Sequence, residues 1–179
     1  MKVFFQELGM YLLNHIVNHV PWYAFRKSCY RFAGMKIGKD SRILMNVFIQ
    51  TPSGISIGDN STINEYCYLD GRGGLSIGNN VSISMYSKVL TGTHDCHSDT
   101  FCYKSEPVIL EDNTWLGISS IVMPGSRLSK GAILAAGSVA IKKGNYEERG
   151  LYSGVPAKLI GYRRTECNYV QSGWKPRFR

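Results

Sequence analysis

The chain has 179 residues, which is enough for one domain, and its formal net charge at pH 7 is +8. A basic chain favours anionic partners, and because no nucleic-acid-binding motif occurs, the partners that remain are a membrane surface or a phosphorylated small molecule. The five cysteines show no C-x-x-C spacing. A scattered, odd-numbered set is typical of a reducing compartment, so we expect a cytoplasmic protein.

The first predicted element is a helix over residues 3–20, where apolar residues recur at helical spacing until Pro21 ends the run. Polar residues such as Asn14 interrupt the apolar run, so the segment is not a membrane span, and it lacks the small-residue cleavage site of a signal peptide. We expect an amphipathic helix that covers one end of the fold or packs against a neighbouring subunit. Basic residues between 26 and 36 leave open the alternative of peripheral contact with the inner face of a membrane.

After the helix, a six-residue pattern recurs: a small residue, any residue, then an aliphatic one. Clear copies are Ser61-Thr-Ile63, Val81-Ser-Ile83, Ser87-Lys-Val89, Ser120-Ile-Val122 and Ser138-Val-Ala140. Residues two apart on a strand point to the same side, so the small and the aliphatic residue both face inward, and the pattern returns on the next face six residues later. The pattern predicts a three-sided β-solenoid, in which three hexads make one coil.

The first three coils begin at Ile37, Ile57 and Ile77, twenty residues apart. The two residues that each coil has beyond three hexads fall in segments 51–54 and 71–74, which contain turn-forming residues.

The pattern breaks over residues 92–107 and resumes at Leu110, after which it keeps strict six-residue spacing through Ala140. The break predicts a loop extruded from a regular stack. The sequence therefore predicts a mainly β protein of about five coils, with an N-terminal helical cap (1–36), a β-helix with its loop (37–142) and a C-terminal connection and basic tail (143–179). The tail carries aromatic residues and several arginines from Arg163 onward.

Four motifs in the second half of the repeat carry a resemblance: Leu110-Glu-Asp-Asn-Thr-Trp-Leu-Gly117, Met123-Pro-Gly125, Ala135-Ala-Gly-Ser138 and Gly154-Val-Pro-Ala-Lys158. They resemble the hexapeptide-repeat acyltransferases, in particular the sugar O-acetyltransferases such as the galactoside and maltose acetyltransferases and the enzymes that acetylate cell-surface polysaccharides. The resemblance covers residues 37–160. It implies a left-handed parallel β-helix, acetyl-CoA as co-substrate, and a homotrimer with active sites between subunits.

Acetyl transfer from a thioester to a hydroxyl needs one general base, and histidine is suited to this role at neutral pH. Of the four histidines, His15 and His19 belong to the N-terminal helix, whereas His94 and His97 lie in the extruded loop. In similar acetyltransferases the catalytic histidine stands where the third coil gives way to the loop, some twenty residues before the tryptophan of an N-x-W hexad, here Trp115. We therefore predict His94 as the general base, with His97 as the weaker candidate and an ordinary exposed loop histidine as the alternative.

Three residues are predicted to bind the acceptor. Asn64 precedes His94 by thirty residues, as does the acceptor-binding asparagine of similar galactoside acetyltransferases, although an asparagine also suits a corner with left-handed backbone. Asp70 lies where similar enzymes often have an acceptor-binding carboxylate, with a solvated turn as the alternative. Trp115 stands between inward residues, so it must face outward, against a neighbouring subunit or as a wall of the active site.

For the acetyl donor, the resemblance assigns Ile118 and Ala136, whose exposed backbone can bond the pantetheine arm. It also assigns Lys142 and Lys158, which match basic positions that meet the phosphates of CoA. Each lysine alone reads as a solvated side chain, and residues 144–149 replace the usual Asp-Val-Pro-Pro connection of the family.

The hypothesis is an acetyltransferase that moves an acetyl group from acetyl-CoA directly to a hydroxyl of a saccharide, either a cell-surface polysaccharide or its precursor, which includes lipid-linked intermediates. Serine, antibiotic or amino-sugar acyltransfer by the same fold is an alternative, and so is a non-catalytic β-helix scaffold. A zinc hydratase of similar architecture would need three histidines, and only His94 and His97 lie near the repeat, so no metal is expected.

Overall fold

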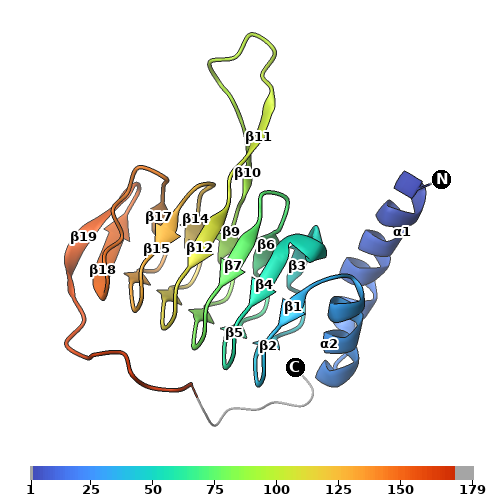
Figure 1. Ribbon diagram of the computed structural model, residues 1–179, viewed down its shortest axis with the longest axis horizontal. Helices are drawn as coiled ribbons and strands as arrows, with labels where there is room; N and C mark the ends of the chain where they lie inside the picture. The colour runs from blue at the N-terminus through green and yellow to red at the C-terminus, as the bar shows by residue number, and fades with distance from the viewer. Residues whose placement is uncertain (1, 172–179) are drawn as a thin grey trace.

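The computed structural model describes residues 2–171. Most of them wind into a three-sided prism of short parallel strands, with two helices at one end and a hairpin that projects from one edge (Figure 1). The last aromatic and basic residues of the predicted tail lie outside the described residues: Trp174, Lys175, Arg177, Phe178 and Arg179.

Three sheets form the sides of the prism, and successive coils add one strand to each. The first sheet contains β1 (Lys36–Ile37), β4 (Ile55–Ile57), β7 (Leu75–Ile77), β12 (Val108–Leu110) and β15 (Arg127–Leu128). The second contains β2 (Arg42–Ile43), β5 (Thr62–Ile63), β8 (Ser82–Ile83), β13 (Trp115–Leu116) and β16 (Ile133–Leu134). The third contains β3 (Phe48–Gln50), β6 (Tyr68–Asp70), β9 (Lys88–Val89), β14 (Ile121–Val122) and β17 (Val139–Ala140).

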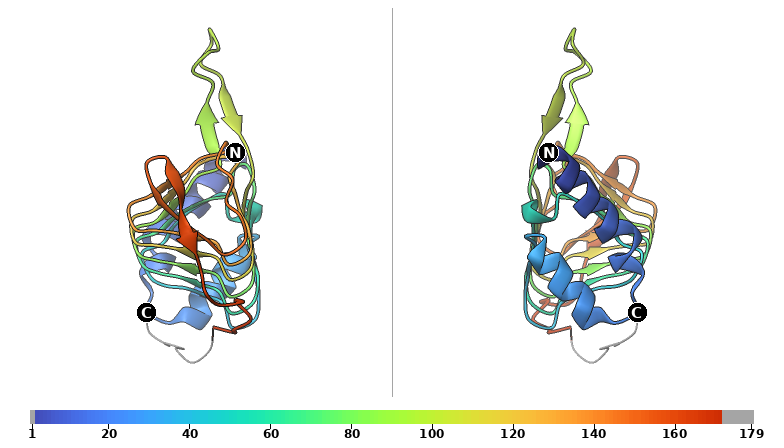
Figure 2. Two further views of the ribbon diagram at one scale, coloured as in Figure 1. Left: turned by 90° about the vertical axis from the view of Figure 1, so that its left-hand side faces the viewer. Right: turned by 90° about the vertical axis from the view of Figure 1, so that its right-hand side faces the viewer.

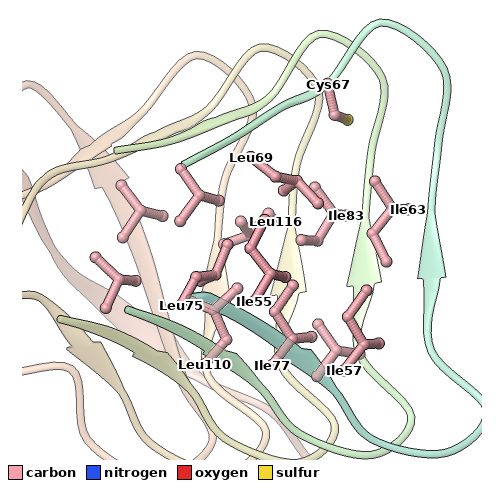
Figure 3. Close-up of a cluster of buried hydrophobic side chains, with 14 of the residues drawn as sticks. Ile55, Ile57, Ile63, Cys67, Leu69, Leu75, Ile77, Ile83, Leu110 and Leu116 are labelled. Carbon is pink, nitrogen blue, oxygen red and sulfur yellow. The ribbon is translucent and has the colours of Figure 1, made fainter. Parts of the chain in front are cut away.

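The register predicted from the hexads is confirmed. On the second sheet, for example, Ile43 pairs with Ile63, which pairs with Ile83, and the ladder continues through Leu116 to Leu134. These five side chains are fully buried. They stack into a column along the inside of the prism, and the other two sheets contribute matching columns (Figure 3). Each coil therefore buries its apolar residues against the coil before and after it, as a solenoid requires.

The solenoid has five complete coils and part of a sixth, slightly more than the five predicted. Tyr146 forms a parallel bridge with Leu128 on the first sheet, and β18 (Gly150–Gly154) pairs with β16 on the second. The antiparallel strand β19 (Ala157–Tyr162) then covers β18 at this end of the stack.

At the other end, α1 (Lys2–His15), the 3-10 turn η1 (Val17–His19) and α2 (Tyr23–Phe32) lie against the first coil (Figure 1). The predicted helix is thus present but ends at His15, and α2 was not predicted. Among the described residues, neither helix has the length and apolar character needed to cross a bilayer.

Polar side chains from this helical cap bond the open strand edges of the first coil. Asn14 accepts from the N–H of Ile49 at 2.8 Å and donates to its carbonyl at 2.9 Å. Arg26, which is fully buried, donates to the carbonyl of Ile43 at 3.1 Å. Because backbone groups at the end of a buried ladder would otherwise lack partners, these side chains let the solenoid begin without an exposed edge.

Two edges of the prism matter for the site. The tyrosine edge joins the second and third sheets and contains the turns 45–46, 65–66, 85–86, 118–119 and 136–137. It is named for Tyr66 and Tyr86, whose rings stack with centroids 5.1 Å apart. The hairpin edge joins the third sheet to the first and contains the segments 51–54, 71–74, 91–107, 123–126 and 141–145.

Candidate active site

The extruded loop is a hairpin made of β10 (Gly92–His94) and β11 (Tyr103–Ser105), which pair antiparallel. It leaves the hairpin edge between the third and fourth coils and extends well beyond the prism (Figures 1 and 2). The predicted loop is therefore confirmed at its place in the stack, and its base is ordered by strand pairing.

His94 stands at the outer end of β10, where it is exposed and paired with Tyr103. Its ring stacks on that of Phe101 with centroids 4.5 Å apart and planes within 5°, and it meets the ring of Tyr103 edge-on at 5.8 Å. Nδ1 of His94 lies 2.9 Å from the carbonyl oxygen of Phe101. A carbonyl only accepts, so Nδ1 must carry the proton of the neutral ring, and Nε2 keeps a free lone pair.

Asp70 holds the base of this hairpin from the preceding coil. Its carboxylate accepts from the guanidinium and the N–H of Arg72, and also from the N–H groups of Thr91 at 3.0 Å and Gly92 at 3.1 Å. Asp70 is fully buried. Burial by itself raises the pKa of a carboxyl group, but the hydrogen bonds from Arg72 and Thr91 outweigh it and lower the pKa of Asp70 below its ordinary value. The carboxylate is thus enclosed by its own chain, unlike the acceptor-facing carboxylate that the resemblance implies.

Arg72 continues the contact outward, because its guanidinium lies over the ring of Tyr103 at 5.5 Å from the centroid. Further along the hairpin edge, toward the C-terminal end of the stack, Nζ of Lys142 forms a salt bridge with the carboxylate of Glu106 at 2.5 Å. Glu106 follows β11 directly, so charged groups tie both arms of the hairpin to other coils, the first arm to Asp70 one coil before it and the second arm to Lys142 two coils after it.

A second group of predicted residues lies on the second sheet, next to the tyrosine edge. Trp115 faces outward and is 47% exposed, and its Nε1 donates to Oγ of Ser84 at 3.0 Å. Asn64, one coil before Ser84 at the equivalent position, donates through Nδ2 to the carbonyl of Ile83 at 2.8 Å. Asn64, Ser84 and Trp115 therefore form a polar and aromatic strip that spans three coils.

The backbone of Asn64 is not left-handed. On this edge the residues with positive φ include Tyr66 at 62° and Tyr86 at 63°, two places after Asn64 and Ser84. The sequence offered a left-handed corner as the alternative explanation for the asparagine at position 64, and this explanation does not apply because Asn64 does not have a positive φ.

Ile118 and Ala136 occupy successive turns of the tyrosine edge, and both are exposed. The carbonyl of Ile118 accepts from the N–H of Gly137 at 2.9 Å, which fixes the two turns relative to each other. The N–H groups of Ile118 and Ala136 have no hydrogen-bond partner among the described residues. Two backbone donors one coil apart at this edge are thus left without a partner among the described residues.

Lys158 is exposed on β19 at the C-terminal end of the stack, where it pairs with Ser153. The N–H of Gly154, next to Ser153, donates to Oγ of Ser138, two residues after Ala136. Lys158 therefore lies at the end of the tyrosine edge, and the structure does not bring it together with Lys142 on the hairpin edge.

Within one chain, the predicted residues thus fall into two groups. His94, Asp70 and Lys142 belong to the hairpin edge, while the strip with Asn64 and Trp115, the turns of Ile118 and Ala136, and Lys158 belong to the tyrosine edge. His97 shares the hairpin with His94, but among residues 2–171 no three His, Cys, Asp or Glu side chains form a group that could hold a metal ion.

Sequence reasoning missed several partners of these residues. Phe101 orients His94, Arg72 links Asp70 to the hairpin, and Ser84 bonds Trp115. Arg72 and Phe101 lie in segments without the hexad pattern, so no periodicity marked them. Ser84 gave no signal because a serine at a turn needs no functional explanation.

Comparison with known proteins supports the repeat. The family model described as the hexapeptide repeat of succinyl-transferase matches residues 34–65 and 107–140, on either side of the third coil and the hairpin. A 2,3,4,5-tetrahydropyridine-2,6-dicarboxylate N-acetyltransferase from Staphylococcus aureus (strain JH9) is 36% identical over 56 residues, which are 31% of this chain and 23% of that protein. The chain therefore matches less than a quarter of the length of that relative.

Solved structures match over far more of the chain. A hexapeptide-repeat-containing acetyltransferase from Vibrio cholerae superposes with a TM-score of 0.81 at 22% identity and covers 90% of this chain and 93% of its own. That acetyltransferase has also been solved in complex with acetyl-CoA. A maltose O-acetyltransferase from Clostridium difficile 630 gives a TM-score of 0.76 at 22% identity, with 90% and 86% of the two chains covered. The resemblance seen in the sequence is confirmed at the level of the repeat and the fold.

Proposed function

Because this chain is built from hexapeptide repeats and folds as hexapeptide-repeat acetyltransferases do, we propose that it is an acyltransferase that moves an acetyl group from acetyl-CoA to a hydroxyl of a saccharide. The saccharide is a cell-surface polysaccharide or its precursor. The observation that carries the proposal is the hydrogen bond from Nδ1 of His94 to the carbonyl of Phe101, which leaves Nε2 as a proton acceptor on an exposed hairpin.

His94 then acts as the general base. Nε2 takes the proton of the acceptor hydroxyl while its oxygen forms a bond to the thioester carbonyl carbon. When the tetrahedral intermediate collapses, the carbon–sulfur bond breaks and the protonated imidazole returns the proton to the sulfur of CoA. Phe101 holds the ring in one orientation by stacking and by the hydrogen bond, so the free nitrogen does not need to reorient during the transfer.

The donor binds along the tyrosine edge. The N–H groups of Ile118 and Ala136, which have no partner among the described residues, donate to carbonyl oxygens of the pantetheine arm, and Lys158 at the end of the same edge meets the phosphates. Lys142 is already paired with Glu106 within its own chain, so it joins phosphate binding only if that salt bridge opens.

The acceptor lies beside the strip of Asn64, Ser84 and Trp115. Nδ2 of Asn64 is engaged by the carbonyl of Ile83, and Oδ1 is left to accept a hydrogen bond from a sugar hydroxyl. The indole of Trp115 offers the flat apolar surface on which a sugar ring packs. We assign Asp70 a positioning role, because its buried carboxylate holds the hairpin that carries His94.

The two edges come together between copies of the chain. The hairpin projects away from its own prism, so the natural partner of His94 is the tyrosine edge of a neighbouring copy (Figure 2). A closed trimer of side-by-side prisms repeats this contact three times around one axis. The homotrimer implied by the resemblance thus suits the geometry of a single chain.

The test is acetyl-CoA turnover against a panel of sugars, nucleotide sugars, amino sugars and serine, with CoA measured by chromatography. A His94→Ala variant should lose activity by about a hundredfold or more, the usual contribution of a general base. His97→Ala, which removes the other histidine of the hairpin, is the matched control and should keep its activity. Full activity in His94→Ala would exclude the proposed mechanism.

The same panel separates the alternatives. Turnover with amino sugars alone would make the protein an N-acyltransferase, as the relative from Staphylococcus aureus is by name. Absence of CoA binding at millimolar concentration would favour a non-catalytic scaffold.

A further inference from the structure

The two helices α1 and α2, which we call the helix pair, carry many exposed large apolar side chains on their outer faces. They are Phe4, Phe5, Leu8, Tyr11, Leu12 and Ile16 on or just after α1, and Trp22, Phe25 and Phe32 on or just before α2. Phe32 is 96% exposed, and Phe4 and Phe5 are each 63% exposed. Scattered single apolar residues on a surface need no explanation, but a contiguous set of this kind marks an interaction site.

The helix pair also encloses a groove. It has a volume of about 860 Å³ and runs between the two helices to the first turn of the hairpin edge. Its lining is mainly apolar and includes Phe5, Met10, Leu13, Phe25, Phe32 and Pro52.

Basic residues lie beside this apolar surface, at the C-terminal end of α2 and in the first coil. Seven of the first 42 residues are Lys or Arg, and two are Asp or Glu. Arg31 on the last turn of α2, and Lys36 and Lys39 just after it, are exposed. Apolar and aromatic side chains beside exposed cations are what a helix needs to lie in the surface of an anionic bilayer.

We propose that the helix pair docks this protein on an anionic phospholipid surface. Neither helix is long enough to cross a bilayer, so the pair lies in the interface with its aromatic side chains inserted. Charge favours this occupant over a second copy of the chain. A symmetric contact between two copies would bring two equally basic surfaces, each with Arg31, Lys36 and Lys39, into one interface, and such an accumulation of like charge is unfavourable.

The position of the helix pair gives the docking a consequence for the acceptor. Thr51, Pro52 and Ser53, which line the groove, belong to the hairpin edge between the first and second coils. His94 rises from that same edge two coils further on, and coils are spaced by about 4.8 Å. In Figures 1 and 2 the N-terminal end of α1 lies on the side of the prism from which the hairpin projects. If the proposed acetyl transfer holds, its acceptor is a saccharide carried at the membrane surface.

The test is co-sedimentation of the full chain with vesicles of phosphatidylglycerol and phosphatidylcholine, compared with vesicles of phosphatidylcholine alone. We expect binding to the anionic vesicles, and loss of most of it when NaCl is raised from about 0.1 to about 0.5 M. A Phe5→Ser/Phe32→Ser double variant should bind about tenfold less or weaker still, because it removes two inserted rings. The matched control is Val155→Ser/Ile160→Ser, which removes two apolar side chains of 73% and 66% exposure at the opposite end of the stack and should bind as the unchanged protein does.

Equal binding by the unchanged protein and the Phe5→Ser/Phe32→Ser variant would overturn the proposal. The proposal would also fail if the unchanged protein did not bind vesicles and formed a larger particle in solution than the Phe5→Ser/Phe32→Ser variant. The helix pair would then join copies of the chain. The variant must keep the circular dichroism and melting temperature of the unchanged protein, as expected for exposed positions. Vesicle binding does not depend on acetyl transfer, so each proposal can fail alone.

Discussion

The guanidinium of Arg72 donates two hydrogen bonds to the carboxylate of Asp70, Nε to Oδ1 and Nη2 to Oδ2, each 2.9 Å long. The same carboxylate accepts from the backbone of Thr91 and Gly92, the residues with which the hairpin begins. A turn of the second coil thereby fixes the direction in which the hairpin leaves the third. The buried carboxylate of Asp70 therefore contributes to the placement of His94, together with the strand pairing inside the hairpin and the salt bridge between Lys142 and Glu106.

We predict that Asp70→Asn reduces both stability and activity. An amide replaces one accepting oxygen with a donor. If the amide nitrogen takes the Oδ2 position, the N–H groups of Thr91 and Gly92 lose their acceptor, and if it takes the Oδ1 position, the backbone N–H and Nε of Arg72 lose theirs. In either orientation the guanidinium of Arg72 loses its counter-ion. Because Arg72 is partly exposed, we expect a loss of about 2 to 3 kcal/mol in the free energy of unfolding. Urea unfolding followed by circular dichroism measures it. An unchanged midpoint would show that the hairpin base does not depend on this carboxylate.

The same variant should change the response to acid. The pKa of Asp70 is lower in the folded protein than in the unfolded chain, so its contribution is complete above the ordinary carboxyl pKa. That contribution is lost as the pH falls through the depressed folded value. The difference in stability between the unchanged protein and Asp70→Asn should therefore be largest near pH 7 and shrink below about pH 4. A constant difference across this range would contradict the ionised role of Asp70.

The coils could be predicted because each aliphatic residue of a column repeats at a fixed spacing, as Ile63 and Ile83 do. The sixth coil was missed because Tyr146 and Tyr152 take the aliphatic places. Both tyrosines are buried and close this end of the core. Their hydroxyls also accept from the backbone N–H groups of Ile141 and Glu147, which gives these N–H groups a partner. A search for aliphatic residues does not detect that solution.

The helix α2 was missed for a similar reason. Its inward residues are Tyr23, Arg26 and Tyr30, and a buried arginine does not read as core. The position of His94 could be predicted because this residue lies where the hexad pattern of the third coil stops and the loop begins. Its hydrogen bond to Phe101 depends on strand pairing inside a hairpin that has no periodic pattern, so only the structure gives it.

We predict that Asn14→Leu weakens the start of the solenoid. Asn14 is buried and satisfies both the N–H and the carbonyl of Ile49, which leucine would leave without partners. The expected loss is about 2 to 4 kcal/mol in the free energy of unfolding. Ser28→Ala on the exposed side of α2 is the control and should change it by less than about 0.5 kcal/mol. Equal effects of the two substitutions would mean that the first coil does not need the bonds from Asn14.

We predict two classes of cysteine in the native protein. Cys96 and Cys102 on the hairpin are exposed and should react with a thiol reagent within the first phase of labelling. Cys67 is buried in a column of the core, and burial raises the pKa of its thiol to about 12, so it should react only after unfolding. Mass spectrometry of peptides labelled before and after addition of urea distinguishes the classes. Early labelling of Cys67 would contradict its place in the core.

The last prediction concerns the copy of the chain that supplies each half of the site. His94→Ala removes the base from the hairpin edge, and Ala136→Asp blocks the tyrosine edge where we place the pantetheine arm, so each variant alone should be inactive. If the two edges meet between copies, co-expression of the two variants restores unmodified sites, and random assembly gives about a quarter of the normal activity. If both edges of one chain formed the site, the mixture would remain inactive. Co-expression of the unchanged chain with the double variant is the matched control, because an intermolecular site then gives about a quarter of the activity and an intramolecular one about a half.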